Sequence, residues 1–277
     1  DMSNPFEILE PTCISFSGGR TSAFMLYKIL EAHDMSLPEE AIVCFANTGK
    51  ECEETLEFVH ACETNWNVKI HWLEYKAHEI PKERFRVVNF ETASRNGEPF
   101  FDSINQNGKP YLPNPVARIC TINMKIRVID HYLKSLGWKH NENMDWVGIR
   151  ADEMRRAAKI DRERTPLVTA GVTKQTVGEF WKSQPFDLDL PNMNGVTMHG
   201  NCDLCFLKQS RAGATHGLAP TRGLPHPRQI ELRIDGEPAR ERVGRRTLRK
   251  GHRHVLRPGG VVSWDVELRH HCSLYRI

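Results

Sequence analysis

The sequence lacks long apolar runs and a recognisable secretion signal. None of its 277 residues lies in an apolar stretch that approaches the roughly 18 residues a membrane span needs. The first residues, Asp1 to Pro5, carry neither the basic region nor the apolar region of a signal peptide. We therefore expect a protein of the cytoplasm that has no membrane partner.

Lysine is scarce at the end of the chain, where arginine is abundant. Residues 209–277 hold 13 Arg, a single Lys and a net charge of +8, whereas residues 1–208 have a net charge of −5. Such a break in composition indicates a boundary, so we expect one domain over 1–208 and a basic, irregular extension over 209–277. Three interpretations of this tail stay open. It binds phosphate backbones, it is solvated or disordered, or it is an out-of-frame or unrelated replacement of the normal C-terminus.

Short apolar runs alternate with longer periodic segments along residues 11–182. The runs at residues 11–16, 41–46, 68–73 and 145–149 predict strands, and the segments at residues 21–32, 51–62, 121–136 and 174–182 predict helices. This order is typical of βαβ units. The sequence therefore predicts an α/β fold, with a Rossmann-like parallel sheet and helices on both faces.

Residues 76–118 interrupt this pattern. They contain five prolines and show no helical or strand periodicity. We expect a long irregular stretch here, and such stretches inside compact domains are usually functional or mobile.

The segment Ser17 to Ser22 lies between the first expected strand and the first expected helix. It lacks the G-K-[ST] ending of a Walker A loop and the spacing of G-x-G-x-x-G. Gly18 and Gly19 tolerate the backbone angles of a sharp turn and let N–H groups approach an anion. Hydroxyl donors and one cation complete the loop: Ser17, Thr21, Ser22 and Arg20. The pattern indicates a phosphate-binding loop, the alternative being a Ser/Gly turn that caps a helix.

The residues from Ser15 to Ser22, Ser-Phe-Ser-Gly-Gly-Arg-Thr-Ser, resemble the PP-loop of the adenine nucleotide α-hydrolase superfamily. Within it the chain is most similar to the phosphoadenosine phosphosulfate (PAPS) reductase family. Three further segments agree with that family: Phe45 to Leu56, Arg118-Ile119-Cys120-Thr121 followed by Lys125, and Gly148 to Glu153 followed by Arg155-Arg156. The resemblance covers residues 12–168 and extends through residues 200–206.

The resemblance implies a HUP-type sheet and a nucleotide-binding domain over residues 1–208. It implies that an adenine nucleotide (ATP, PAPS or adenosine phosphosulfate, APS) contacts Ser15, Ser17, Gly18, Gly19, Arg20, Thr21, Ser22, Asn47, Thr48, Gly49, Arg118 and Arg150. By the same resemblance Lys125 and Arg150 are the candidate catalytic residues. Taken singly, Arg118, Lys125 and Arg150 are also compatible with solvated surface charges or ion pairs. Asp152 and Glu153 are either ligands of Mg²⁺ or partners of Arg155 and Arg156.

Cys202-Asp203-Leu204-Cys205 has the spacing of a metal-ligand pair. Cys120 adds a third thiol from the R-x-C-T element, and three soft thiolates suit an iron–sulfur cluster with one open iron. Cys272 is a candidate for a fourth ligand. A zinc site completed by His199, and three unlinked reduced thiols, are the alternatives.

The chain departs from assimilatory PAPS reductases at its end. Those enzymes use a cysteine in an E-C-G-[IL]-H segment, and His271-Cys272-Ser273-Leu274 matches it poorly. The expected reaction is therefore either attack on the sulfur of a sulfonucleotide, with a thiol or electron-donor protein as partner, or cleavage at the α-phosphate of ATP with Mg²⁺. One alternative is an iron–sulfur sulfurtransferase that thiolates a nucleic acid, and another is a non-catalytic nucleotide-binding regulator.

Overall fold

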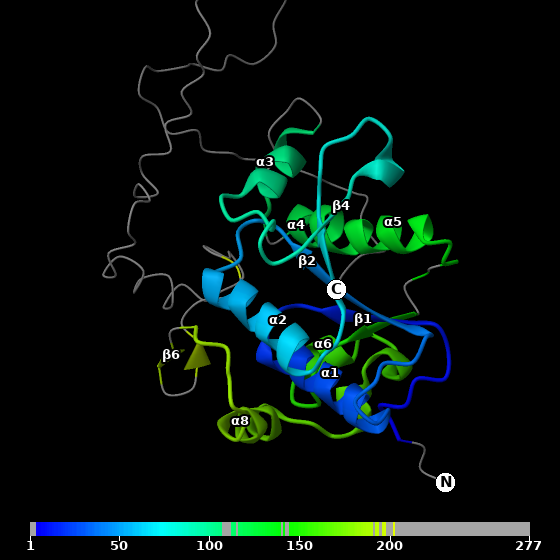
Figure 1. The fold of residues 1–277 in the computed structure, drawn as a ribbon, viewed down its shortest axis with the longest axis vertical. Coiled ribbons are helices and arrows are strands. Elements are labelled where there is room, and N and C mark those ends of the chain that lie inside the picture. Colours follow the sequence, from blue (N-terminus) through cyan, green and yellow to red (C-terminus); the bar gives the residue numbers. More distant parts are fainter. Residues whose placement is uncertain are drawn as a thin grey trace, which may run out of the picture. The chain divides into compact units, whose positions relative to one another are not determined.

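A computed structural model describes residues 4–106, 112–114, 116–139, 141, 144–190, 192–193, 196–197 and 202. The expected basic tail, residues 209–277, lies outside these residues, as do His199, Cys205 and Cys272. Figure 1 shows the arrangement of the described elements.

Five of the described strands form one sheet in the order β4-β3-β2-β1-β5. The strands are β1 (Thr12–Phe16), β2 (Ala41–Asn47), β3 (Ile70–Glu74), β4 (Arg86–Val88) and β5 (Asp145–Val147). β1, β2, β3 and β5 are parallel, and β4 is an antiparallel edge strand. The apolar runs of the sequence become the central strands because a parallel sheet is covered on both faces.

Helices cover both faces of this sheet (Figure 1). α1 (Arg20–Ala32), α2 (Glu53–Asn65) and α8 (Lys174–Lys182) contribute to one apolar core, in which Phe24 of α1 meets Phe180 of α8 with ring centroids 5.0 Å apart. α5 (Arg127–Ser135) contributes Val128 and Leu133 to a second core on the other face. The expected Rossmann-like α/β fold, with helices on both faces, is confirmed.

The helix expected over residues 121–136 is not uniform. It consists of α4 (Ile119–Thr121), a π-helical turn (Ile122–Ile126) and α5. A π-helical turn contains one residue more per turn than an α-helix and is frequent at functional sites.

The expectation of an irregular segment over residues 76–118 is wrong in two places. The chain forms the edge strand β4 and the helix α3 (Glu98–Asn105), with a 3-10 turn at Pro81–Glu83. β4 has only three residues and an exposed side, so it carries no apolar run. The N-cap of α3 is Gly97, which has a φ of +88°. Because the N-cap is not a Ser, Thr, Asp or Asn, the sequence gives no ordinary signal for the start of this helix.

The remaining described elements follow β5. They are α6 (Met154–Ala157), a 3-10 turn (Arg162–Arg164), α7 (Pro166–Thr169), and the short antiparallel pair β6 (Asn192–Met193) and β7 (Val196–Thr197). In the part of the chain that the structure describes, we find no helix whose length and apolarity suffice to cross a bilayer.

Candidate nucleotide-binding site

The loop between β1 and α1 turns through two glycines. Gly18 has a φ of +74°, and a Cβ atom added there would lie 2.8 Å from Thr55 Cγ2 and 3.1 Å from Phe45 Cε2. Gly18 therefore meets both a backbone need and a packing need. Gly19 is the N-cap of α1 and provides no side-chain hydrogen bond to the helix. The first N–H groups of α1 consequently have no side-chain cap, which is the arrangement that accepts an anion.

Ser22 holds the shape of this loop. Its hydroxyl oxygen accepts a hydrogen bond from the Ser17 N–H at 3.2 Å, lies 3.0 Å from Ser17 Oγ and donates to the Gly19 carbonyl at 2.9 Å. The chain after β5 approaches closely as well, since a Cβ atom on Gly148 would lie 2.9 Å from Ser22 Cα. Ser22 is thus a positioning residue, whereas Ser17 is exposed.

Arg150 follows β5 and reaches the same loop. Its guanidinium donates to Thr21 Oγ1 at 3.1 Å and to Asp152 Oδ1 at 2.9 Å, and lies 3.5 Å from Glu153 Oε2. Arg156 pairs with Glu153 at 2.5 Å. The structure therefore brings Arg150 to the loop, as the sequence predicts.

Both candidate Mg²⁺ ligands form ion pairs with arginines: Asp152 with Arg150, and Glu153 with Arg156. Partial burial raises the pKa of Asp152, but hydrogen bonds from Arg150 and the Lys174 N–H outweigh burial and hold this pKa below its usual value. Of the two expectations for these carboxylates, the geometry favours ion pairing. The partner of Asp152 is Arg150 rather than Arg155 or Arg156.

Arg20 begins α1 but points to a distant part of the chain. Its Nε and one terminal nitrogen each donate to the Asp187 carboxylate at 2.6 Å, and the same terminal nitrogen donates to the Leu188 carbonyl at 3.0 Å. Trp181 Nε1 donates to the Arg20 carbonyl at 3.0 Å. The guanidinium thus forms a bidentate ion pair that fixes α1 to the segment after α8.

Asn47 lies at the carboxyl end of β2 and is buried. Its amide donates to Glu74 Oε1 at 2.7 Å and to the Ser94 carbonyl at 2.9 Å, and its oxygen accepts from the Gly49 N–H at 2.9 Å. All of these contacts stay within the protein. Asn47 therefore shapes the turn at Thr48-Gly49 next to the loop, and Ser15 is one strand away on β1, in register with Cys44.

A buried carboxylate, Glu51, connects three elements. Its Oε2 accepts from the Thr48 N–H and hydroxyl, both at 2.7 Å. Its Oε1 accepts from Lys125 Nζ at 3.2 Å and from Cys202 Sγ at 3.3 Å. Glu51 and Cys202 also share a backbone bridge. We call Glu51, Lys125, Cys120 and Cys202 the Lys125 cluster.

Charge is concentrated in the Lys125 cluster. Burial alone would lower the pKa of Lys125, but the neighbouring Cys202, Glu51 and Cys120 raise it well above its ordinary value. Burial raises the pKa of Glu51, whereas Lys125 and the hydrogen bonds from Thr48 lower it more, so the net pKa is lowered. Lys125 Nζ lies 4.0 Å from Cys202 Sγ. Cys202 Sγ therefore has two charged neighbours, the Lys125 ammonium group and the Glu51 carboxylate to which it donates.

The Lys125 cluster holds two of the three cysteines expected to bind a metal. Cys120 and Cys202 both act on the same ammonium group, and Cys205 is outside the described residues. Two sulfur donors are compatible with an iron–sulfur or a zinc site. Within the described ranges, no three His, Cys, Asp or Glu side chains are arranged to hold a metal ion. Arg118, expected near the nucleotide, is the N-cap of α4, which leads directly into the π-helical turn that carries Lys125.

Sequence reasoning missed Glu51 and Asp187. A signal for Glu51 exists, because Thr48 and Glu51 have the T-x-x-E spacing at which side chain and backbone exchange hydrogen bonds. No local signal exists for Asp187, which lies 167 residues from Arg20.

Comparison with known proteins shows a similarity to a phage protein. The chain is 28% identical over 203 residues to the nin region protein ORF290 of Escherichia phage lambda, which is described as uncharacterized. The match covers 72% of this chain and 66% of that protein, so the chain spans just under two thirds of its relative. No protein-family model matches the chain.

Proposed function

We propose that this protein is a PAPS reductase-like enzyme that binds the phosphate or sulfate groups of an adenine nucleotide at the Ser17–Ser22 loop. The observation that carries the proposal is the turn at Gly18, which leads into an α1 N-terminus without a side-chain cap. Arg150 donates to Thr21 at the edge of this turn. Backbone N–H groups, a helix dipole and a nearby cation together favour an anionic ligand.

The reaction we propose takes place between the loop and the Lys125 cluster, either as attack on the sulfur of a sulfonucleotide (PAPS or APS) or as cleavage at the α-phosphate of ATP. Both reactions build negative charge on phosphate or sulfate oxygens, and positioned donors that meet this charge lower the barrier. Arg150 and Lys125 are the cations that we propose as these donors. The ATP reaction requires Mg²⁺, and the sulfonucleotide reaction requires a thiol or electron-donor protein. We place the enzyme in the cytoplasm, as the sequence leads us to expect.

The Lys125 cluster favours a second candidate, a sulfurtransferase that thiolates a nucleic acid. Cys120 and Cys202 both act on the Lys125 ammonium group, so the cluster places two sulfur atoms near one cation. With Cys205, these residues would hold an iron–sulfur cluster, which would supply the redox and sulfur-binding chemistry. Zinc at the same thiolates is the alternative metal.

Calorimetric titration with ATP, APS and PAPS tests the nucleotide site. The backbone at Gly19 has φ −109° and ψ 160°, an extended conformation that any residue adopts, so Gly19→Trp places a large side chain over the N–H groups without backbone strain. We expect this variant to raise the nucleotide Kd at least about 100-fold, or about 2.7 kcal/mol.

Gly178→Trp is the matched control, because nothing lies within 4 Å of a Cβ atom added to Gly178 on α8. It should bind like the wild type. Unchanged binding by Gly19→Trp would sink the proposal. Release of pyrophosphate or of sulfite then distinguishes the two reactions, and tight binding with neither product identifies a regulator.

A further inference from the structure

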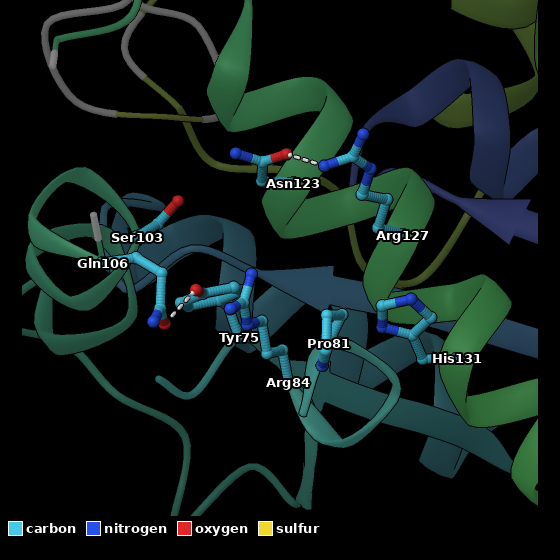
Figure 2. Close-up of a pocket in the computed structure, with 8 residues that line it drawn as sticks. All are labelled: Tyr75, Pro81, Arg84, Ser103, Gln106, Asn123, Arg127 and His131. Atoms are coloured by element: carbon cyan, nitrogen blue, oxygen red, sulfur yellow. Dashed lines mark hydrogen bonds between the residues drawn. The ribbon is translucent and has the colours of Figure 1, made fainter. Parts of the chain in front are cut away.

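A cavity of about 350 Å³ lies between α3 and α5, and its lining includes none of the residues that the sequence assigns to the nucleotide (Figure 2). We call it the α3–α5 pocket. Its lining consists of Tyr75, Pro81, Arg84, Ser103, Gln106, Asn123, Arg127 and His131. Its volume is in the range of roughly 300–1,000 Å³ that is typical of small-molecule sites.

Residues from four segments meet around this pocket. Ser103 and Gln106 come from the end of α3, and Arg127 and His131 lie on the opposite side on α5 (Figure 2). Tyr75 directly follows β3, and Arg84 directly follows the 3-10 turn. The Tyr75 hydroxyl donates to Gln106 Oε1 at 2.7 Å, which ties the β3 end to α3.

The cations of the pocket are held by neutral oxygens. Arg84 Nε donates to the His78 carbonyl at 2.7 Å, and Arg127 donates to Asn123 Oδ1 at 2.9 Å. None of the eight lining residues is an Asp or a Glu. The two guanidinium groups therefore keep their full net charge at the cavity wall.

The titration of His131 reflects this charge. Burial is the main cause that lowers its pKa, and the charges of Lys134, Arg127 and Arg84 lower it further. Asp130, its neighbour on α5, is the group that opposes them. Asp102 lies close enough to Tyr75 to act on that hydroxyl, but it is exposed and is not part of the lining. The potential in the pocket is thus positive.

Two buried polar atoms of the lining have no protein partner among the described residues. They are Ser103 Oγ, on a residue that is 8% exposed, and His131 Nδ1. Buried hydroxyl and imidazole nitrogen atoms are usually hydrogen-bonded, so a ligand that supplies partners to both atoms fits this lining.

We propose that the α3–α5 pocket binds a small molecule that carries a phosphate or sulfate monoester. Arg84 and Arg127 bind the tetrahedral oxyanion, and Ser103 and His131 bind oxygen atoms of the same ligand. Guanidinium groups suit such anions because their planar N–H groups contact two oxygens at once. The lining of this pocket shares no residue with the proposed nucleotide site, so separate variants can test the two.

Calorimetry with ribose 5-phosphate, inorganic phosphate and sulfate tests the pocket, using the full chain that carries Gly19→Trp so that the loop does not contribute. We expect ribose 5-phosphate to bind more tightly than either free ion, and Arg127→Gln to weaken it at least about tenfold. Arg162→Gln removes the same charge from an exposed site and is the matched control. No binding up to about 10 mM, or equal losses in both variants, overturns the proposal.

Ser103→Ala keeps the proposal testable if an arginine variant fails to fold. This hydroxyl has no hydrogen-bond partner among the described residues, so we expect its removal to leave the fold intact and to weaken ribose 5-phosphate binding about two- to tenfold. Binding that does not change in Ser103→Ala, or a free phosphate that binds as tightly as the ester, would count against a site for an organic monoester.

The pH dependence of sulfate binding gives a separate readout. Between about pH 4 and 8 sulfate keeps its charge, while His131, whose pKa is lowered from 6.5, gains a proton as the pH falls below that ordinary value. Sulfate should bind more tightly at the lower pH, and His131→Asn should remove this dependence. If both proteins show the same pH profile, His131 does not contact the anion and the proposed ligand contacts are wrong.

Discussion

The Ser17–Ser22 loop and the α3–α5 pocket carry arginines in opposite electrostatic states. At the loop, Arg20 and the neighbouring Arg150, which follows β5, are paired with carboxylates at 2.6 and 2.9 Å. In the pocket, Arg84 and Arg127 donate to a carbonyl and an amide oxygen, so their charge is not neutralised. The loop must therefore attract an anion mainly through its backbone, whereas the pocket must do so through side chains.

This difference has consequences for stability. A site made of backbone depends on glycine geometry and internal hydrogen bonds, so substitutions at Gly18 and Ser22 should destabilise the fold. A site made of side chains that point into a cavity should tolerate truncation with little loss of stability. The three predictions that follow test this difference, beginning with the largest expected effect.

Gly18→Ala should lower the free energy of unfolding by about 2–4 kcal/mol. The residue has a φ of +74°, and its new methyl group would meet Thr55 Cγ2 at 2.8 Å, so left-handed strain and overpacking act together. Urea unfolding followed by tryptophan fluorescence measures the change.

Gly171→Ala separates these two causes. Gly171 has a φ of +66°, but nothing lies within 4 Å of its added Cβ atom, so we expect a cost of only about 1–2 kcal/mol from the backbone. Equal losses in the two variants would mean that Gly18 is not closely packed and that the loop is less rigid than described.

Glu51→Gln should destabilise the protein by about 2 kcal/mol at neutral pH. A neutral amide cannot accept hydrogen bonds from Thr48, Lys125 and Cys202 at the same time. Because the Lys125 side chain is 30% exposed, loss of the ion pair should destabilise the protein less than loss of a fully buried pair would. Because the pKa of Glu51 is lowered in the folded protein, its contribution is complete above its ordinary value of 4.5 and is lost as the pH falls through the folded value.

Urea unfolding of both proteins between about pH 7 and about pH 3 tests this dependence. The difference between wild type and Glu51→Gln should shrink below pH 4.5, the ordinary value for this carboxyl. Glu57→Gln, on the exposed side of α2, is the control and should have little effect. If the difference in free energy of unfolding between the two proteins does not change with pH, Glu51 is not ionised in the folded protein at neutral pH.

A pair of serines gives the smallest and most direct contrast. Ser22→Ala should cost about 1–2 kcal/mol, because it removes the hydrogen bonds that Ser22 Oγ forms with the Ser17 N–H and the Gly19 carbonyl. Ser103→Ala should leave the free energy of unfolding unchanged or raise it by up to about 1 kcal/mol, because an unpaired buried hydroxyl is removed. A loss in Ser103→Ala as large as in Ser22→Ala would remove the distinction between the two sites.

The central fold could be predicted because its signals are local. The apolar runs that become β1 and β2 and the periodic segment 174–182 that becomes α8 lie in short windows of sequence. The edge strand β4 could not be predicted in this way, since its three residues are ordered by pairing with β3 rather than by their own pattern.

The candidate site divides in the same manner. The turn at Gly18 and the approach of Arg150 follow from the order of strands and helices, because the carboxyl ends of parallel strands share one edge. The pairing of Arg20 with Asp187 and of Glu51 with Cys202 depends on contacts between distant segments. For this reason the sequence predicts that Arg20 contacts the ligand, whereas in the structure Arg20 forms an ion pair with Asp187.

The π-helical turn at Ile122–Ile126 records a single extra residue within one helix. Lys125 lies on this turn and reaches Glu51, whereas Arg127 and His131 follow it and face the α3–α5 pocket. Deleting one residue of the turn would restore regular winding and rotate everything beyond it by about 100° relative to Cys120. The insertion therefore lets one helix contribute to both the Lys125 cluster and the α3–α5 pocket, and related chains that lack it should keep at most one of these two sites.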